Sequence, residues 1–158
     1  MALVLHLQNA QFLKGRYDRQ GRVTFRGVSQ FTQTVENCED EAIWDERFEW
    51  PVASSIEKYE TIEICLYNFN KFRSKKLVGK FEMVLQKLVE DGQLYLTESL
   101  LDANNTAIAT TITLNLQYQA PDGTVGDWMK EDFAYKHLPD DQVDNAGDDI
   151  FDIASLTS

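Results

Sequence analysis

Apolar and polar residues alternate along most of the chain, in short runs separated by turn residues. Leu3, Leu5 and Leu7 share one face of the first run, and Ile62, Ile64 and Leu66 share one face of a later run. This period of two is typical of half-buried β-strands. The pattern predicts an all-β fold, an eight-stranded antiparallel β-sandwich, with strands over residues 3–7, 22–26, 31–35, 43–52, 61–67, 77–84, 94–100 and 108–116.

One segment departs from this period. Leu85, Leu88 and Val89 have helical spacing, and Gly92 follows them as a C-cap glycine would, so we expect one short helix between the sixth and seventh strands. We also expect at least two of Trp44, Phe48 and Trp50 to be largely buried between the sheets, because large aromatic side chains dominate sandwich cores.

Composition limits the domain organisation. The chain has 158 residues, of which 43% are apolar, and this suits one domain with a sizeable core plus a tail. No apolar run approaches the ~20 residues that a membrane-spanning helix needs, and the start lacks the features of a signal peptide. These features predict a cytoplasmic protein in which Cys38 and Cys65 stay reduced.

The net charge of −11 is unevenly distributed. Residues 1–120 hold 13 basic and 16 acidic side chains, a net charge of −3, whereas residues 121–158 hold 2 and 10, a net charge of −8. We therefore predict a folded domain over residues 1–120 and an acidic, flexible linker over residues 121–158. A chain this acidic lacks the basic surface that nucleic-acid binding requires.

Positive charge gathers between the strands expected over residues 61–67 and 77–84. Lys71, Arg73, Lys75 and Lys76 occupy this stretch with no acidic residue among them, and Leu77-Val78-Gly79 opens the following strand. The arrangement of a strand, a loop and a second strand beginning Leu-Val-Gly resembles the third calcium-binding loop of a C2 domain.

Longer strings resemble one family of C2 proteins. They are DRQGRVTFRG (residues 18–27), VENCED (35–40), FEWPVASSIE (48–57), MVLQKLVE (83–90) and YQAPDGTVGDW (118–128), besides the opening MAL. On these strings the chain is similar to the first C2 domain of a ferlin, in the otoferlin-like group. The resemblance implies a C2 domain of type II topology at the amino terminus of a large, tail-anchored protein with several C2 domains that acts in vesicle fusion and membrane repair.

The same resemblance implies that calcium binding is lost. Members of the family that bind calcium carry carboxylates where this chain has Asn68, Asn70 and Lys76, and only Asp18 matches a first-loop ligand. Because calcium takes six to eight oxygen ligands, largely charged ones, we expect no calcium and no other cofactor at this degenerate site. An alternative role for Asp18 is a structural contact with Arg16, Arg19 or a backbone amide.

If the first and third loops meet at one end, as in other C2 domains, basic and aromatic side chains surround one apex. Such a mixture suits an anionic membrane surface, since the cations meet lipid phosphates and the rings lie at the interface. The candidate membrane-binding residues are Lys14, Arg16, Arg19, Lys71, Arg73, Lys75, Lys76, Tyr17, Phe69 and Phe72. The alternative is a solvated basic surface that contributes only solubility.

Three functions therefore remain open, none of them with a catalytic site in this chain. His6 lies in the first strand and His137 in the acidic tail, and neither has a nucleophile or metal-ligand partners near it in sequence. The first function is a weak, calcium-independent membrane contact. The second is docking on other ferlin domains or fusion proteins, and the third is the C2 appendage of an enzyme such as a lipase, which the ferlin strings disfavour.

Overall fold

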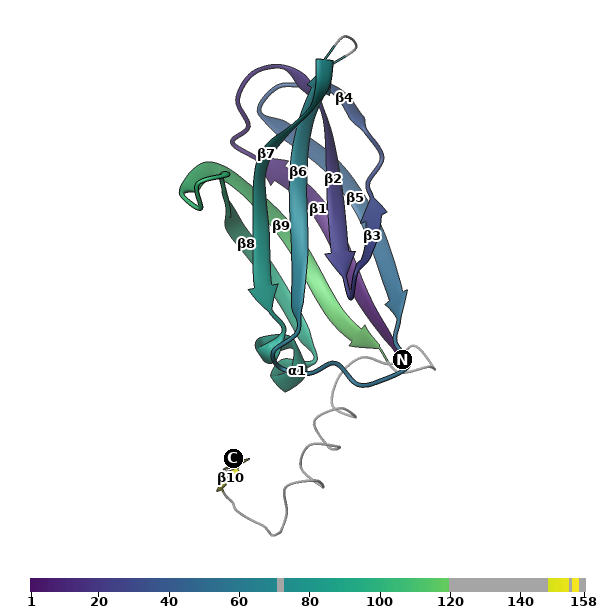
Figure 1. Cartoon of the computed structure of the whole chain (residues 1–158), viewed down its shortest axis with the longest axis vertical. Coiled ribbons are helices and arrows are strands. Elements are labelled where there is room, and N and C mark those ends of the chain that lie inside the picture. The colour runs from purple at the N-terminus through teal and green to yellow at the C-terminus, as the bar shows by residue number, and fades with distance from the viewer. Residues whose placement is uncertain (71–72, 120–147, 154, 157–158) are drawn as a thin grey trace.

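The computed structural model describes residues 1–70, 73–119, 148–153 and 155–156. Figure 1 shows two layers of antiparallel strands with one short helix at the lower end. The elements are β1 (Ala2–Gln11), β2 (Tyr17–Phe25), β3 (Val28–Phe31), β4 (Val35–Cys38), β5 (Glu41–Pro51), β6 (Thr61–Asn70), β7 (Arg73–Val84), α1 (Gln86–Asp91), β8 (Gln93–Leu101), β9 (Ala107–Gln119), β10 (Asp148–Ile153) and β11 (Ser155–Leu156).

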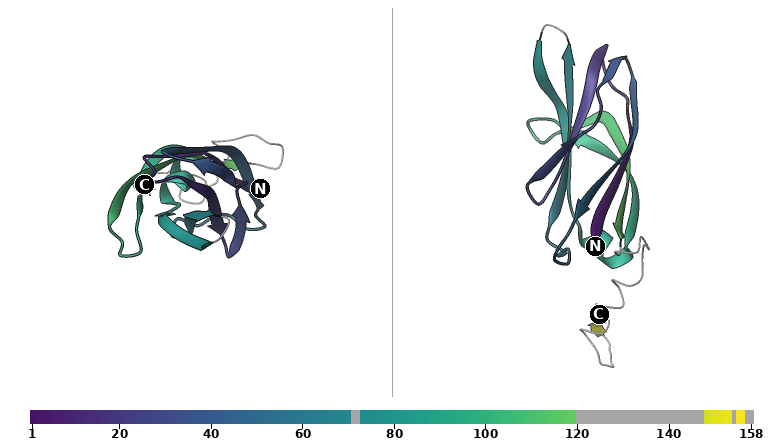
Figure 2. Two further views of the ribbon diagram at one scale, coloured as in Figure 1. Left: turned by 90° about the horizontal axis from the view of Figure 1, so that it is seen from above. Right: turned by 90° about the vertical axis from the view of Figure 1, so that its right-hand side faces the viewer.

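The main sheet contains nine strands in the order β3-β2-β6-β7-β8-β9-β1-β5, with β4 paired to β2. It folds over into two layers, β3/β4-β2-β6-β7 and β8-β9-β1-β5, which Figure 2 shows edge-on. A single residue pair, Lys80 with Leu101, joins β7 to β8 and so joins the two layers. The predicted antiparallel sandwich is confirmed.

The core lies between the two layers and is built from the inward residues of the alternating runs. Leu3, Leu5 and Leu7 of β1 face Ile62 and Ile64 of β6, and all five side chains are at most 1% exposed. At about 1.5–3 kcal/mol for each fully buried aliphatic side chain, burial of this kind is the main stabilising term of the fold.

All three predicted core aromatics are buried: Trp44, Phe48 and Trp50 are 8%, 6% and 4% exposed. The Trp50 ring meets the Phe25 ring edge-to-face with centroids 6.3 Å apart, and its Nε1 donates a hydrogen bond to the Val28 carbonyl oxygen at 3.0 Å. The aromatic pair and the hydrogen bond connect β5 to the β2–β3 hairpin of the opposite layer.

The predicted helix is present as α1, which buries Leu88 and Val89 and ends at Gly92. Gly92 has φ +79°, a left-handed conformation that glycine adopts without steric cost, and its amide donates to the Leu88 carbonyl oxygen at 2.7 Å.

The prediction of one strand over residues 31–35 is wrong. β3 ends at Phe31 and β4 begins at Val35, so the main sheet of the described residues has nine strands where eight were expected. Thr32 causes the break because it turns toward β2: its Oγ1 accepts a hydrogen bond from the Gly21 amide at 2.8 Å, and its own amide donates to the Gly21 carbonyl oxygen at 2.9 Å. The hydroxyl accepts the Gly21 amide hydrogen that the Thr32 carbonyl oxygen would accept in a regular ladder, so the pairing of β3 with β2 stops at Phe31.

The proposed boundary between domain and linker at residues 120–121 follows directly after β9, which ends at Gln119. Residues 120–147 lie outside the described residues, and β10 pairs with β11 in a short antiparallel hairpin. The flexible character of the acidic segment stays a prediction.

Candidate functional site

One end of the sandwich gathers the segments that the sequence placed at the apex. Here the β1–β2 loop (residues 12–16), the β4–β5 turn (residues 39–40) and the β6–β7 hairpin come together, at the top of Figure 1. The Leu13 amide donates a hydrogen bond to the Asp40 carbonyl oxygen at 3.0 Å and so ties the loop to the turn. We use the word apex for these three segments.

The stretch expected as a loop over residues 68–76 is largely a β-hairpin. β6 continues to Asn70 and β7 begins at Arg73, with Asn68 opposite Lys76 and Asn70 opposite Arg73. Pairing therefore extends almost to the tip, with two register shifts, one between Leu66 and Tyr67 and one between Asn68 and Asn70. Lys71 and Phe72, two of the predicted membrane-binding residues, lie outside the described residues.

The predicted calcium position is poor in carboxylates. Asp18 is the one acidic side chain among its four predicted residues, and Asn68, Asn70 and Lys76 supply two amides and an ammonium. No group of three or more His, Cys, Asp and Glu side chains suited to a metal occurs within the described residues. Chemically, this donor set does not fit a divalent cation.

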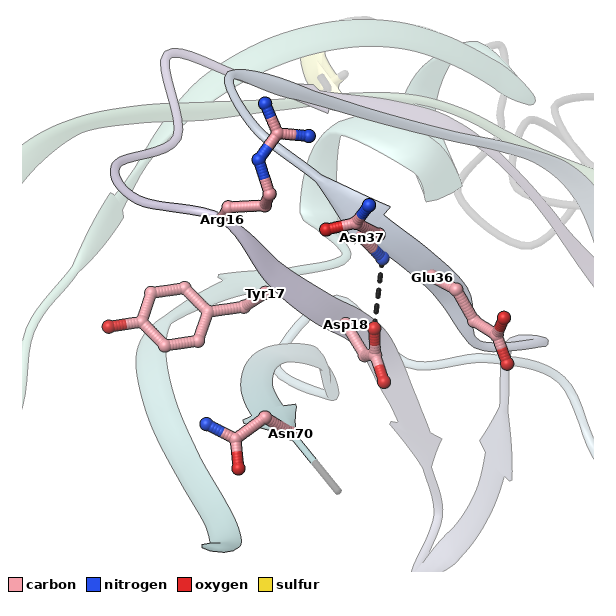
Figure 3. A pocket seen from close by; sticks show the side chains of 6 residues that line it. All are labelled: Arg16, Tyr17, Asp18, Glu36, Asn37 and Asn70. Carbon is pink, nitrogen blue, oxygen red and sulfur yellow. Dashed lines mark hydrogen bonds between the residues drawn. The ribbon is translucent and has the colours of Figure 1, made fainter. Parts of the chain in front are cut away.

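Asp18 has the structural contact that was the alternative prediction. Its Oδ1 accepts a hydrogen bond from the Asn37 amide at 2.8 Å, which links β2 to β4 (Figure 3). The partner is a backbone amide, and neither Arg16 nor Arg19 pairs with this carboxylate within the described part of the chain.

A cavity of about 400 Å³ opens beside Asp18. Figure 3 shows residues of β2, β4 and β6 around it. Its walls are formed by Arg16, Tyr17, Asp18, Glu36, Asn37 and Asn70. Glu36 and Asn37 were not predicted as lining residues, because β4 was not expected as a separate strand.

Arg19 does not belong to the exposed basic surface that was predicted to bind membranes. It was expected among the exposed cations, but its side chain is 0% exposed. Arg19 is an inward-facing residue of β2, and its Nη2 donates to the Gly15 carbonyl oxygen at 2.7 Å. Burial lowers the pKa of Arg19 from its ordinary value, yet a guanidinium stays protonated at neutral pH. A side chain in this position cannot contact lipid.

The remaining predicted cations differ in how exposed they are and in whether they are paired with an acidic side chain. Lys14 and Lys76 are exposed, and neither takes part in an ion pair within the described residues. Arg16 is exposed but pairs with Glu39, the Nη2–Oε1 distance being 2.8 Å. Such a surface pair is weak, so Arg16 can exchange its partner.

Lys75 turns away from the tip and lies over the outer face of the β3-β2-β6-β7 layer. Its Nζ is 4.5 Å from the Tyr67 ring centroid and 4.9 Å from the Phe31 ring centroid. These distances suit cation–π interactions. The alternation of β6 predicted an outward Tyr67, but nothing in the sequence placed Phe31 beside Lys75, since β3 pairs with β2 and not with the hairpin.

The predicted membrane-binding aromatic residues also differ in their exposure. Tyr17 is 38% exposed at the rim of the cavity, whereas Phe69 is half-buried. Phe12, which the sequence did not single out, is 63% exposed in the β1–β2 loop. This end of the sandwich thus combines exposed cations with two exposed rings, Phe12 in the β1–β2 loop and Tyr17 directly after it.

With this geometry in place, comparisons decide the family. Residues 3–100 match the C2 domain family. The chain belongs to the C2 domain family. It is 35% identical over 133 residues to Fer-1-like protein 4 of mouse, an alignment that covers 84% of this chain and 7% of that protein. The predicted resemblance to a ferlin C2 domain is confirmed, and the chain spans only a small part of the relative's length.

Solved structures share the fold at low identity. The C2A domain of plant Extended Synaptotagmin 1 superposes with a TM-score of 0.62 at 14% identity, covering 75% of this C2 chain and 96% of that one. Human GIVD cytosolic phospholipase A2 superposes with a TM-score of 0.59 at 14% identity, covering 73% and 16%. At these identities the likeness concerns the fold alone.

Within the described residues, no helix is both long enough and apolar enough to cross a membrane.

Proposed function

We propose that this C2 domain is a non-catalytic module that contacts anionic membranes weakly, and independently of calcium, through its apex. The observation that carries the proposal is the presence of two exposed cations, Lys14 of the β1–β2 loop and Lys76 of the β6–β7 hairpin, at one end of the sandwich. Exposed Phe12 and Tyr17 lie in or directly after the same β1–β2 loop. Exposed cations and rings at one end of a domain suit an interface of lipid phosphates and acyl chains.

Independence from calcium is supported by the hairpin register. Lys76 stands directly opposite Asn68, so an ammonium and an amide occupy paired positions at the degenerate site. A lysine ammonium about 4 Å from a divalent ion is repelled by roughly 2 kcal/mol in water, and by more where water is excluded. Asp18 is already engaged by the Asn37 amide and provides little compensation.

The contact is weak when taken alone. Each engaged cation contributes about 1 kcal/mol near an anionic leaflet, so three engaged cations give about −3 kcal/mol, which is weaker than millimolar affinity. In a protein with several C2 domains, such a contact adds avidity to neighbouring contacts. We propose this role at the cytosolic face of vesicle or plasma membranes, within a larger ferlin of vesicle fusion and trafficking.

Charge reversal tests this proposal. Lys14→Glu combined with Lys76→Glu should abolish sedimentation with phosphatidylglycerol-containing vesicles at low salt. The matched control is Lys58→Glu with Lys87→Glu, which makes the same change in net charge at exposed positions near α1, at the opposite end (Figure 1). Equal loss of binding in both variants would show that net charge alone, and not the apex, governs the interaction.

A second candidate function is docking on another protein without lipid contact. Its support is a hollow of about 220 Å³ on the outer face of the β9-β1-β5 layer, lined by Val4, His6, Arg47, Asn115 and Gln117. This face is rich in uncharged amides, which suit a polar protein interface better than a membrane. It becomes the favoured function if the wild-type chain ignores anionic vesicles even at low salt.

A further inference from the structure

We propose that Arg19 is a built-in cation that holds the β1–β2 loop against the β4–β5 turn, so that the apex is ordered without any bound metal ion. The inference rests on the calcium independence proposed above and deepens it, because it names what replaces a metal in positioning the loops. Arg19 is a positioning residue in this account and touches no lipid.

Carbonyl oxygens from both segments surround one nitrogen of the guanidinium. Nη2 of Arg19 lies 2.7 Å from the Gly15 oxygen and 3.2 Å from the Lys14 oxygen, both in the β1–β2 loop. It lies 3.3 Å from the Glu39 oxygen and 3.5 Å from the Cys38 oxygen, at the β4–β5 turn. Two hydrogens are shared among four acceptors, an arrangement closer to the oxygen shell of a cation than to a single hydrogen bond.

The charge has no carboxylate partner. Arg19 is 0% exposed, and none of the ion pairs in the described part of the chain includes it. Its Nε and Nη1 are buried, and neither has a hydrogen-bond partner among the residues that the structure describes. A buried charge of this kind is costly, and an apolar residue of similar size is often more favourable for stability. Carbonyl dipoles converging from two loops are therefore the main compensation that the structure provides.

The local backbone is shaped around this contact. Gly15 has φ +75°, and a Cβ there would lie 2.7 Å from Cε2 of Tyr17. The Tyr17 ring in turn lies 5.3 Å from Cζ of Arg19. A side chain at position 15 would push the ring away, so the glycine lets the Gly15 carbonyl and the Tyr17 ring both approach the guanidinium.

The other side-chain link between the same two segments is weaker. Arg16 and Glu39 form an ion pair whose side chains are 55% and 66% exposed, and exposed pairs contribute only about 0–1 kcal/mol. This makes Arg16 a matched control, since it lies three residues before Arg19, has the same side chain and bridges to the same turn.

Amide hydrogen exchange of the full chain, without lipid, tests the proposal. The Leu13 amide is the reporter, because it donates to Asp40 across the loop–turn contact. Arg19→Met should speed its exchange about tenfold or more, Arg19→Lys should also speed it, and Arg16→Gln should change it less than about threefold. Amides of the β1–β9 ladder, such as that of Leu5, should keep their wild-type exchange in every variant and so show that the sandwich is folded.

Each outcome decides the matter. Unchanged or slower exchange of the Leu13 amide in Arg19→Met would mean that packing alone orders the loop, and the proposal would be overturned. An equal effect of Arg16→Gln would overturn it as well. If Arg19→Met does not fold, Arg19→Lys decides by the same comparison. Recovery of slow exchange in Arg19→Met on adding calcium would contradict the calcium independence of the proposed function, while leaving the link through Arg19 supported.

Discussion

The backbone of Gly79 lies so close to Leu101 that a Cβ at position 79 would stand 2.9 Å from the Leu101 carbonyl oxygen. The same Cβ would be 2.9 Å from Cβ of Leu100. This contact lies next to the Lys80–Leu101 pair, which joins β7 to β8. The two layers can approach each other here because glycine has no side chain. The Leu-Val-Gly string that first suggested a C2 domain thus has a packing role.

Gly79→Ala should therefore destabilise the fold by about 1–3 kcal/mol, because β7 and β8 must move apart to accept a methyl group. Urea denaturation followed by tryptophan fluorescence measures the change. Gly27→Ala is the control, since its added Cβ meets no atom within 4 Å. This variant should be destabilised only by the cost of placing alanine at a positive φ, about 1 kcal/mol. Equal losses of unfolding free energy in the two variants would mean that β7 and β8 are not tightly packed at Gly79.

Trp50→Ala should cost about 3–5 kcal/mol, since it leaves a cavity next to Phe25 and Phe48. Trp50→Phe keeps most of the packing but removes the hydrogen bond from Nε1 to the Val28 carbonyl oxygen, and it should cost about 1–3 kcal/mol. Denaturation curves of the two variants separate packing from hydrogen bonding. A loss below 1 kcal/mol in Trp50→Ala would contradict the buried position of the ring.

The fold was largely predictable because most of the long strands have one buried face, which the short β3 and β4 lack. Leu3, Leu5 and Leu7 or Ile62, Ile64 and Leu66 show that face directly in the sequence, and the aromatic core was predicted for the same reason. The break at Thr32 was not predictable, since it depends on a hydrogen bond to Gly21, a residue on a neighbouring strand.

The apex was predicted less well. The strand was expected to begin at Arg22, whereas β2 begins at Tyr17 and so carries Arg19 inward, in phase with Val23 and Phe25. Lys75 was likewise expected at the tip, whereas the rings of Phe31 and Tyr67 hold it on the side of the sandwich. Long basic side chains reach several neighbours, so their contacts are set by tertiary packing and not by the local pattern.

Stability should fall on acidification through the Arg26–Glu60 pair. The two side chains form paired hydrogen bonds of 2.7 and 2.8 Å, and the hydrogen bond from Arg26 lowers the pKa of Glu60. The folded state therefore holds this carboxylate ionised to lower pH than the unfolded chain, in which its pKa is about 4.3. The contribution is complete above that value and is lost as the pH falls through the lowered pKa.

Denaturation of the wild type and of Glu60→Gln across pH 3 to pH 7 measures this contribution. The difference in unfolding free energy between the two proteins should shrink toward acidic pH and be largest near neutrality. A difference that is constant with pH would show that the ionisation of Glu60 does not contribute to stability.

Lys75 and Lys76 should differ in their effect on vesicle binding. Lys76→Met should weaken binding more than Lys75→Met, because Lys76 is exposed without a described partner whereas the Lys75 ammonium lies over two rings. Titration with phosphatidylglycerol-containing vesicles at low salt measures both. If Lys75→Met has the larger effect, the lipid contact lies on the outer face of the sheet and not at the apex.

Vesicle co-sedimentation with calcium or a chelator, at low and at moderate salt, tests the central claim most directly. We expect the same binding to phosphatidylglycerol-containing vesicles with and without calcium. Binding should be weaker near 0.15 M salt, where the Debye length is about 8 Å. Binding that requires calcium, together with a calorimetric calcium site tighter than about 0.1 mM, would contradict the central claim.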